Sequence, residues 1–187
     1  MSNNYQFCPF CGTQLIQEWI SGATRPHCPQ CEFTQFYDPK VSVIGLITHN
    51  DKLLLTQRAV DPAKGQWALP GGYMDAGEMP KDALQRELLE EVGLHIQIVA
   101  LHDIYPMIKP EAHGRSNPGI VIVYHAIPQQ VTPDGKVAYD DTTIPPLKAL
   151  DDVCDARWFV RTDIPDNLAF ESTKALLSLW QNDQLQL

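Results

Sequence analysis

The stretch from Gly72 to Leu94 constrains the fold of this chain most strongly. It carries Glu87, Glu90 and Glu91, which share one face if the segment is helical, because residues three and four apart are neighbours on a helix. Like charges at this spacing repel each other by roughly a few tenths of a kcal/mol per pair. The glutamates therefore form either a solvated acidic face or a set of oxygen ligands for a hard cation such as Mg²⁺ or Mn²⁺.

The residues on either side of the cluster favour the ligand interpretation. A breaker-rich loop, residues 69–72, precedes it, and the paired glycines Gly71 and Gly72 let the backbone approach a ligand closely. Pro80 suits the first turn of a helix, and Gly93 suits the residue that ends one. We therefore expect a substrate-binding loop at Gly71 and Gly72, then an acidic helix, then a β-rich segment.

The spacing of the defined residues resembles the Nudix box. The pattern of that box, G-x5-E-x7-R-E-U-x-E-E-x-G-U with U aliphatic, is matched at every defined position by Gly72, Glu78, Arg86, Glu87, Leu88, Glu90, Glu91, Gly93 and Leu94. The resemblance implies an α+β fold, namely an α/β/α sandwich with a mixed sheet. It also implies a hydrolase that acts on nucleoside diphosphates linked to another moiety.

The same resemblance assigns roles to individual residues. It implies that Glu87, Glu90 and Glu91 are catalytic ligands of Mg²⁺ or Mn²⁺, that the Gly72 carbonyl adds a further ligand, and that Arg86 and Glu78 brace the loop against the helix. Met79 stands where relatives often carry Ser or Thr, so this helix is expected to lack a side-chain N-cap. A non-catalytic nucleotide sensor stays open as an alternative, although such sensors tend to lose the glutamates that are present here.

A second motif lies near the N-terminus. Cys8, Cys11, Cys28 and Cys31 form two CxxC pairs, a spacing typical of a tetrahedral Zn²⁺ site in a zinc ribbon. Two disulfides are the alternative, which a reducing compartment disfavours. A segment this small cannot build its own core, so bound metal should stabilise it. We expect a zinc ribbon over residues 1–36 and a Nudix domain over residues 37–187, an arrangement similar to NADH, ADP-ribose and FAD pyrophosphatases.

Charge argues against nucleic acid as a partner. The 187-residue chain has 14 Lys and Arg against 23 Asp and Glu, a net charge of -9. Nucleic-acid binding draws much of its strength from basic residues, yet residues 1–36 contain one arginine, Arg25, and no lysine. An RNA-end processing enzyme is thus the weaker alternative. No apolar run is long enough to span a membrane, and no export signal is evident, so we expect a cytoplasmic protein.

Hydrophobic patterns predict the remaining elements. We expect strands at residues 41–48, 53–58, 94–105, 119–127 and 155–160, a closing helix at 170–181, and a loop or arm at 128–150. Trp67 is interpreted as core packing, with substrate stacking as the alternative. Cys154, the odd cysteine, is interpreted as a small buried apolar residue.

The loop at residues 106–118 is the candidate substrate-selecting segment, since long loops inside compact domains are often functional. Glu111 is its one carboxylate and the candidate auxiliary base, and Arg115 is either a phosphate ligand or solvated. Pro110 matches a marker of ADP-ribose pyrophosphatases, whereas the SQPWPFPxS array of NADH pyrophosphatases is absent. The resemblance therefore implies ADP-ribose as the leading substrate candidate, with FAD and NADH as related candidates and NADH lowered by the missing array; it also implies a homodimer.

Overall fold

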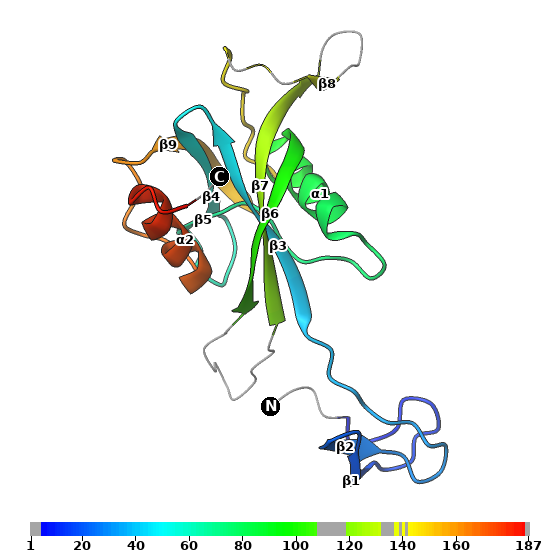
Figure 1. Ribbon diagram of the computed structural model, residues 1–187. Coiled ribbons are helices and arrows are strands. Elements are labelled where there is room, and N and C mark those ends of the chain that lie inside the picture. The colour runs from blue at the N-terminus through cyan, green and yellow to red at the C-terminus, as the bar shows by residue number, and fades with distance from the viewer. Residues whose placement is uncertain (1–4, 108–118, 132–136, 139, 141, 186–187) are drawn as a thin grey trace. The chain divides into compact units, whose positions relative to one another are not determined.

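The structure, a computed structural model, describes residues 5–107, 119–131, 137, 138, 140 and 142–185 of the chain. They form two compact units: the described part of the small one is residues 5–40 with Gly119, and the larger one covers Val41–Met107 and the described residues from Ile120 onward. Figure 1 shows the elements of both. Within the described part of the chain, no helix is long and apolar enough to cross a membrane.

The small unit consists of two similar cysteine-bearing turns and one hairpin. Strands β1 (Ile16–Ile20) and β2 (Ala23–His27) pair in antiparallel fashion. In each turn, a backbone N–H four residues after the first cysteine bonds back to that cysteine's carbonyl: Gly12 to Cys8 at 2.9 Å and Glu32 to Cys28 at 3.1 Å. Both donor residues have positive φ, 73° and 61°. The two turns thus share one backbone conformation.

The larger unit is built on a seven-stranded sheet. Its strands are β3 (Lys40–His49), β4 (Lys52–Arg58), β5 (Trp67–Ala68), β6 (His95–Met107), β7 (Gly119–Val131), β8 (Val137–Ala138) and β9 (Val153–Val160). The order is β5-β4-β3-β7-β6, with β9 paired to β4 and β8 to β7. The β3–β4, β4–β5, β4–β9 and β7–β8 pairs are antiparallel. Because β3 and β7 run in the same direction in Figure 1, the sheet is mixed.

Alternation along the strands gives the sheet two apolar faces. In β4, Leu54 belongs to one buried cluster, while Leu53 and Leu55 belong to the other. This is the period-two pattern of a strand buried on both sides. Helix α1 (Pro80–Val92) covers the first face and helix α2 (Glu171–Gln181) covers the second, as Figure 1 shows. The predicted α/β/α sandwich is confirmed.

Three details bear on the expectations from sequence. Trp67 is 6% exposed and packs edge-on against Phe159 with 5.0 Å between ring centroids, so core packing is confirmed. The predicted loop at 128–150 is partly wrong, because β7 continues through Pro128 to Val131 and pairs with β8. Cys154 was predicted to be buried and is exposed. It lies where the β4–β9 register shifts, which interrupts the alternation that a regular strand would have.

Candidate functional site

The three glutamates of helix α1 are buried to different extents. The helix starts with Pro80 in its first turn and ends at Gly93, whose φ of 66° allows its N–H to bond to the carbonyls of Leu88 and Leu89. As expected, Met79 makes no side-chain cap. The Glu90 side chain is 49% exposed, that of Glu87 is 13% exposed, and Glu91 as a residue is 5% exposed. The acidic face is therefore not a uniformly solvated surface.

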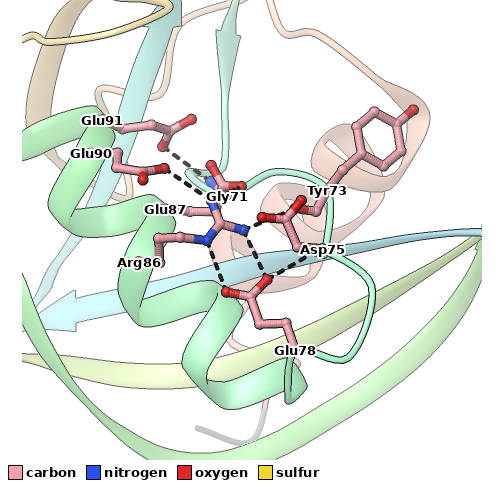
Figure 2. A network of polar contacts seen from close by, with 8 residues as sticks. All are labelled: Gly71, Tyr73, Asp75, Glu78, Arg86, Glu87, Glu90 and Glu91. Carbon is pink, nitrogen blue, oxygen red and sulfur yellow. Dashed lines mark hydrogen bonds and ion pairs between the residues drawn. The ribbon is translucent and has the colours of Figure 1, made fainter.

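Arg86 connects the helix to the loop that precedes it (Figure 2). Its Nε and Nη2 donate to the two oxygens of Glu78 at 2.8 and 3.0 Å, and Nη2 also donates to the Tyr73 carbonyl at 3.1 Å. Its Nη1 donates to Glu87 Oε1 and to Glu90 Oε2, both at 2.9 Å. All five guanidinium donors are thus engaged, and each of Glu87 and Glu90 keeps one oxygen that Arg86 does not bind.

The charges of this network shift the pKa values of its members. Hydrogen bonds from Arg86 and from the Asp75 N–H lower the pKa of Glu78 to about 2. Burial raises the pKa of Glu87, and Arg86 offsets this only in part. Glu87 is therefore a carboxylate that additional positive charge would stabilise.

Glu91 is the most strongly perturbed carboxyl group. Burial raises its pKa well above the ordinary value of 4.5, and the charges of Asp152 and Glu87 add to this effect. The Gly71 N–H, which donates to Glu91 Oε2 at 3.1 Å, and the charge of Arg58 act in the opposite direction. Within the described residues, this buried carboxyl group accepts one hydrogen bond, from the Gly71 N–H, and a carboxylate of this kind is a group that a cation neutralises.

The two glycines allow the loop to lie against the helix. A Cβ on Gly72 would stand 2.6 Å from the Glu87 carboxyl group, so any other residue here would push that carboxyl group out of its present position. Gly71 has a φ of +133°, and a Cβ there would meet the Val43 carbonyl at 2.2 Å. The Gly72 carbonyl accepts the Val43 N–H at 2.9 Å. A carbonyl oxygen has a second lone pair, so its predicted role as a metal ligand stays a prediction.

Two residues near the glutamates, Asp152 and Arg58, were not predicted from the sequence. Asp152 raises the pKa of both Glu87 and Glu91 through its charge, and it lies 3.8 Å from the guanidinium of Arg58. The loop before β9 brings it there, because the Leu150 N–H bonds to the Glu91 carbonyl at 2.9 Å. The position of Asp152 in the sequence, relative to residues 72–94, does not predict that it lies near Glu87 and Glu91. The predicted residues Glu111 and Arg115, with Pro110, lie outside the described residues.

The four predicted zinc ligands come together in the small unit. The sulfurs of Cys8, Cys11, Cys28 and Cys31 lie within 4.8 Å of one another, and three of their separations are 3.4, 3.4 and 3.6 Å. A tetrahedron with Zn–S bonds of ~2.3 Å has edges of about 3.8 Å, whereas a disulfide bond is about 2.05 Å long. The cysteines are free, and their arrangement fits a tetrahedral metal ion.

The thiols influence one another's ionisation. Thr13, through its hydroxyl and its backbone, lowers the pKa of Cys11 to about 6. The Phe33 backbone lowers the pKa of Cys31, but the neighbouring Cys8 thiol and burial outweigh it and raise that pKa to about 12. Four thiolates cannot share this space without a cation.

Comparison with known proteins agrees with this geometry. The sequence matches the NUDIX domain family over residues 37–179. It is 32% identical to the ADP-ribose pyrophosphatase of Methanocaldococcus jannaschii over 155 residues, which cover 81% of this chain and 80% of that protein. It is 27% identical to the NAD-capped RNA hydrolase NudC of Stutzerimonas stutzeri over 87% of this chain, but spans only 51% of that protein.

Solved structures share the fold. The crystal structure of a NUDIX hydrolase from Nitrosomonas europaea superposes with a TM-score of 0.76 at 24% identity, covering 96% of this chain and 92% of that one. The NUDIX domain of Shewanella oneidensis NrtR, crystallised with ADP ribose, superposes with a TM-score of 0.57 at 21% identity, covering 81% and 91%. The family match spans most of the chain, and the archaeal relative is similar over most of both proteins. This chain belongs to the Nudix family.

Proposed function

We propose that this protein hydrolyses the pyrophosphate bond of a nucleoside diphosphate linked to another moiety, with ADP-ribose as the preferred candidate and FAD and NADH as related ones. The proposal depends on three glutamates of α1 that differ in burial, Glu87, Glu90 and Glu91. The loop at Gly71 and Gly72 lies directly against them. The name of the archaeal relative supports the choice of ADP-ribose, as does its coverage of both chains.

The donor set fits Mg²⁺ or Mn²⁺. Carboxylate oxygens are the ligands these hard cations prefer, and burial leaves Glu87 and Glu91 short of positive charge. We infer that Glu87, Glu90 and Glu91 would hold the ions, with the Gly72 carbonyl as a further ligand. When bound, such ions acidify a water molecule and offset charge on phosphoryl oxygens.

The chain itself positions the reacting groups. Arg86 holds one oxygen of Glu87 and one of Glu90 and thereby orients their other oxygens, as outer hydrogen-bond partners do in metal sites. Water attacks one phosphorus, the bridging P–O bond breaks, and a glutamate takes the proton from the water. That glutamate is one of the box residues or Glu111. ADP-ribose and water would give AMP and ribose 5-phosphate.

A substrate panel tests this proposal. Purified protein with saturating Mg²⁺ or Mn²⁺ should release AMP from ADP-ribose faster than from FAD or NADH, as measured by separating the products. Binding of ADP-ribose without turnover would favour the nucleotide sensor instead. Retention of the protein on RNA at physiological salt would favour RNA-end processing, which the net charge of -9 opposes.

We propose further that Zn²⁺ occupies the four-cysteine cluster as a structural ion. The sulfur separations and the sequence spacing support this choice. The division into a ribbon at residues 1–36 and a Nudix domain at 37–187 is part of the same proposal. A homodimer is proposed on family resemblance alone, and light scattering of the purified protein measures its mass directly.

A further inference from the structure

An exposed aromatic ring stands at the start of α2 in an unfavourable backbone conformation. Phe170 precedes the helix with φ 57° and ψ 138°, a combination that residues with a Cβ rarely adopt. Its exposed fraction is 43%. Backbone strain of this kind persists only where the surrounding structure enforces it, and it is concentrated at functional sites.

The neighbours of Phe170 show what enforces this conformation. The preceding residue, Ala169, is fully buried, and its N–H donates to the Trp67 carbonyl at 2.7 Å. The Trp67 N–H in turn donates to the Asn167 carbonyl at 3.0 Å, and the Asn167 side chain donates to the Gly65 carbonyl at 3.1 Å. These bonds fix the start of α2 to β5 and thereby fix the backbone from which the Phe170 ring projects.

That place adjoins the glutamate site through β5. Trp67 and Ala68 form β5, and the chain leaves it directly into the loop whose Gly71 N–H donates to Glu91. The strand that anchors Phe170 is thus the same one that leads to the backbone donor of the buried glutamate. Only residues 69 and 70 separate β5 from Gly71.

Arg58 provides a second connection. Its guanidinium carbon lies 5.3 Å from the centroid of the Phe170 ring. The same group donates from Nε to the Pro62 carbonyl at 2.8 Å and approaches Asp152 at 3.8 Å. Asp152 follows the segment that bonds to the Glu91 carbonyl through Leu150. Arg58 therefore bridges the aromatic ring and the acidic site.

We propose that Phe170, with Arg58 against its ring, forms a subsite for the aromatic base of a nucleoside diphosphate. The inference rests on the proposed function and deepens it, because it assigns the base to one end of the site and the diphosphate to the glutamates. Bases stack on aromatic side chains without demanding a particular hydrogen-bond pattern. A ring that projects from a fixed backbone loses less freedom on binding a base than one on a flexible segment.

A pair of leucine variants tests the subsite. Phe170→Leu keeps an apolar side chain and the same backbone penalty but removes the aromatic face. Its control is Phe36→Leu, because Phe36 is also exposed, at 52%, and also lies under an arginine, with Arg25 at 4.7 Å from its centroid. Calorimetry in saturating Mg²⁺ measures binding of AMP, which carries a base, and of inorganic pyrophosphate, which does not.

We expect Phe170→Leu to weaken AMP binding about fivefold or more, the lower range for loss of one base–aromatic stack. Pyrophosphate binding should change less than about twofold, and Phe36→Leu should leave both ligands unaffected. Unchanged AMP binding in Phe170→Leu overturns the proposal, as does equal weakening of AMP and pyrophosphate. A wild-type protein that binds pyrophosphate but not AMP overturns it too.

A glycine variant separates a binding role from a structural one. Phe170→Gly relieves the strained backbone, so its Tm should not fall, while AMP binding should weaken as in the leucine variant. A lower Tm with unchanged AMP binding would show that the ring serves packing and would overturn the proposal. Failure of the proposed hydrolysis is recognised separately, as a wild-type protein that turns over no diphosphate in the substrate panel.

Discussion

The four cysteines of the small unit and the three glutamates of α1 differ in what surrounds them. The sulfurs of Cys8, Cys11, Cys28 and Cys31 have one another as neighbours. The glutamates instead have Arg86 and the Gly71 N–H, which already bind one oxygen of each carboxylate. Carboxylates that are held by fixed hydrogen-bond donors can keep their geometry without metal even where their charge is only partly offset, whereas four thiolates without any such partner charge cannot.

This difference separates two uses of a cation. If zinc occupies the cysteine cluster as proposed, the fold of the small unit should depend on the ion, because about 40 residues bury too little apolar surface to be stable alone. In the larger unit, two apolar clusters on either side of the sheet stabilise the fold, so the proposed Mg²⁺ or Mn²⁺ should be needed for chemistry and not for folding. Substitutions in the two units should therefore have different consequences, and the largest is expected at the glutamates.

Glu90→Gln should reduce turnover about a hundredfold or more, because a ligand charge is lost at a site where even outer-partner changes have effects of about 10–100-fold. The fold should persist, since the side chain is 49% exposed and the volume hardly changes. Steady-state kinetics and circular dichroism measure the two outcomes. Asp82→Asn, an exposed acid in the first turn of the same helix, is the matched control. Full activity in Glu90→Gln would remove the metal assignment.

Cys11→Ser should release zinc and unfold the small unit, because zinc binding supplies roughly 10–16 kcal/mol in comparable small domains. The melting of the larger unit and the turnover per folded larger unit should change little. Metal analysis and two-dimensional NMR follow the two units separately. Cys154→Ser is the control, since Cys154 lies in β9, outside the cluster. If Cys11→Ser retains a full equivalent of zinc, the four-cysteine site is wrong.

The smallest predicted effect concerns Glu91 and pH. Because the folded state raises its pKa above 4.5, the stability linked to Glu91 is fully present below that pH and is lost as pH rises through the raised pKa. In protein prepared without Mg²⁺ or Mn²⁺, Glu91→Gln should therefore raise the Tm at pH 7–8. Each kcal/mol gained corresponds to about 2–4 °C in a protein of this size.

The contribution of Glu78 to folding stability has the opposite pH dependence, and it changes over a lower pH range. Its pKa is lowered to about 2, so the stability it provides is present above 4.5 and lost as pH falls toward 2. Thermal melts between pH 5 and 8 therefore exclude Glu78, and the difference between Glu91→Gln and the wild type separates Glu91 from Glu87 and Cys11, whose pKa values are also shifted. An unchanged or lower Tm for Glu91→Gln at pH 7–8 would mean that the buried carboxylate is compensated without metal.

Much of this architecture could be predicted from sequence, for local reasons. The spacing of Glu87, Glu90 and Glu91, the helix end at Gly93 and the two CxxC turns are all set within a few residues along the chain. The strands that form the sheet's core were predictable from their apolar runs. Each of these features depends on helix or strand period and on the conformational freedom of glycine.

The remainder depends on contacts between distant segments. Asp152 approaches Glu91 because the chain after the β8 segment returns to the end of α1. The spacing of residues within either segment does not predict this contact. Cys154 is exposed because of a register shift against β4. Phe170 is placed by hydrogen bonds between residues about one hundred positions apart, such as that from Ala169 to Trp67. Helical periodicity predicted α2 but not the conformation of the residue before it.

Diffraction from crystals grown with Mn²⁺ tests the central claim most directly. Anomalous scattering locates the ion independently of any assumption about its ligands. We predict Mn²⁺ at about 2.1 Å from carboxylate oxygens of Glu87, Glu90 and Glu91. Mn²⁺ found elsewhere, with Arg86 and the Gly71 N–H remaining the only partners of these carboxylates, would contradict it.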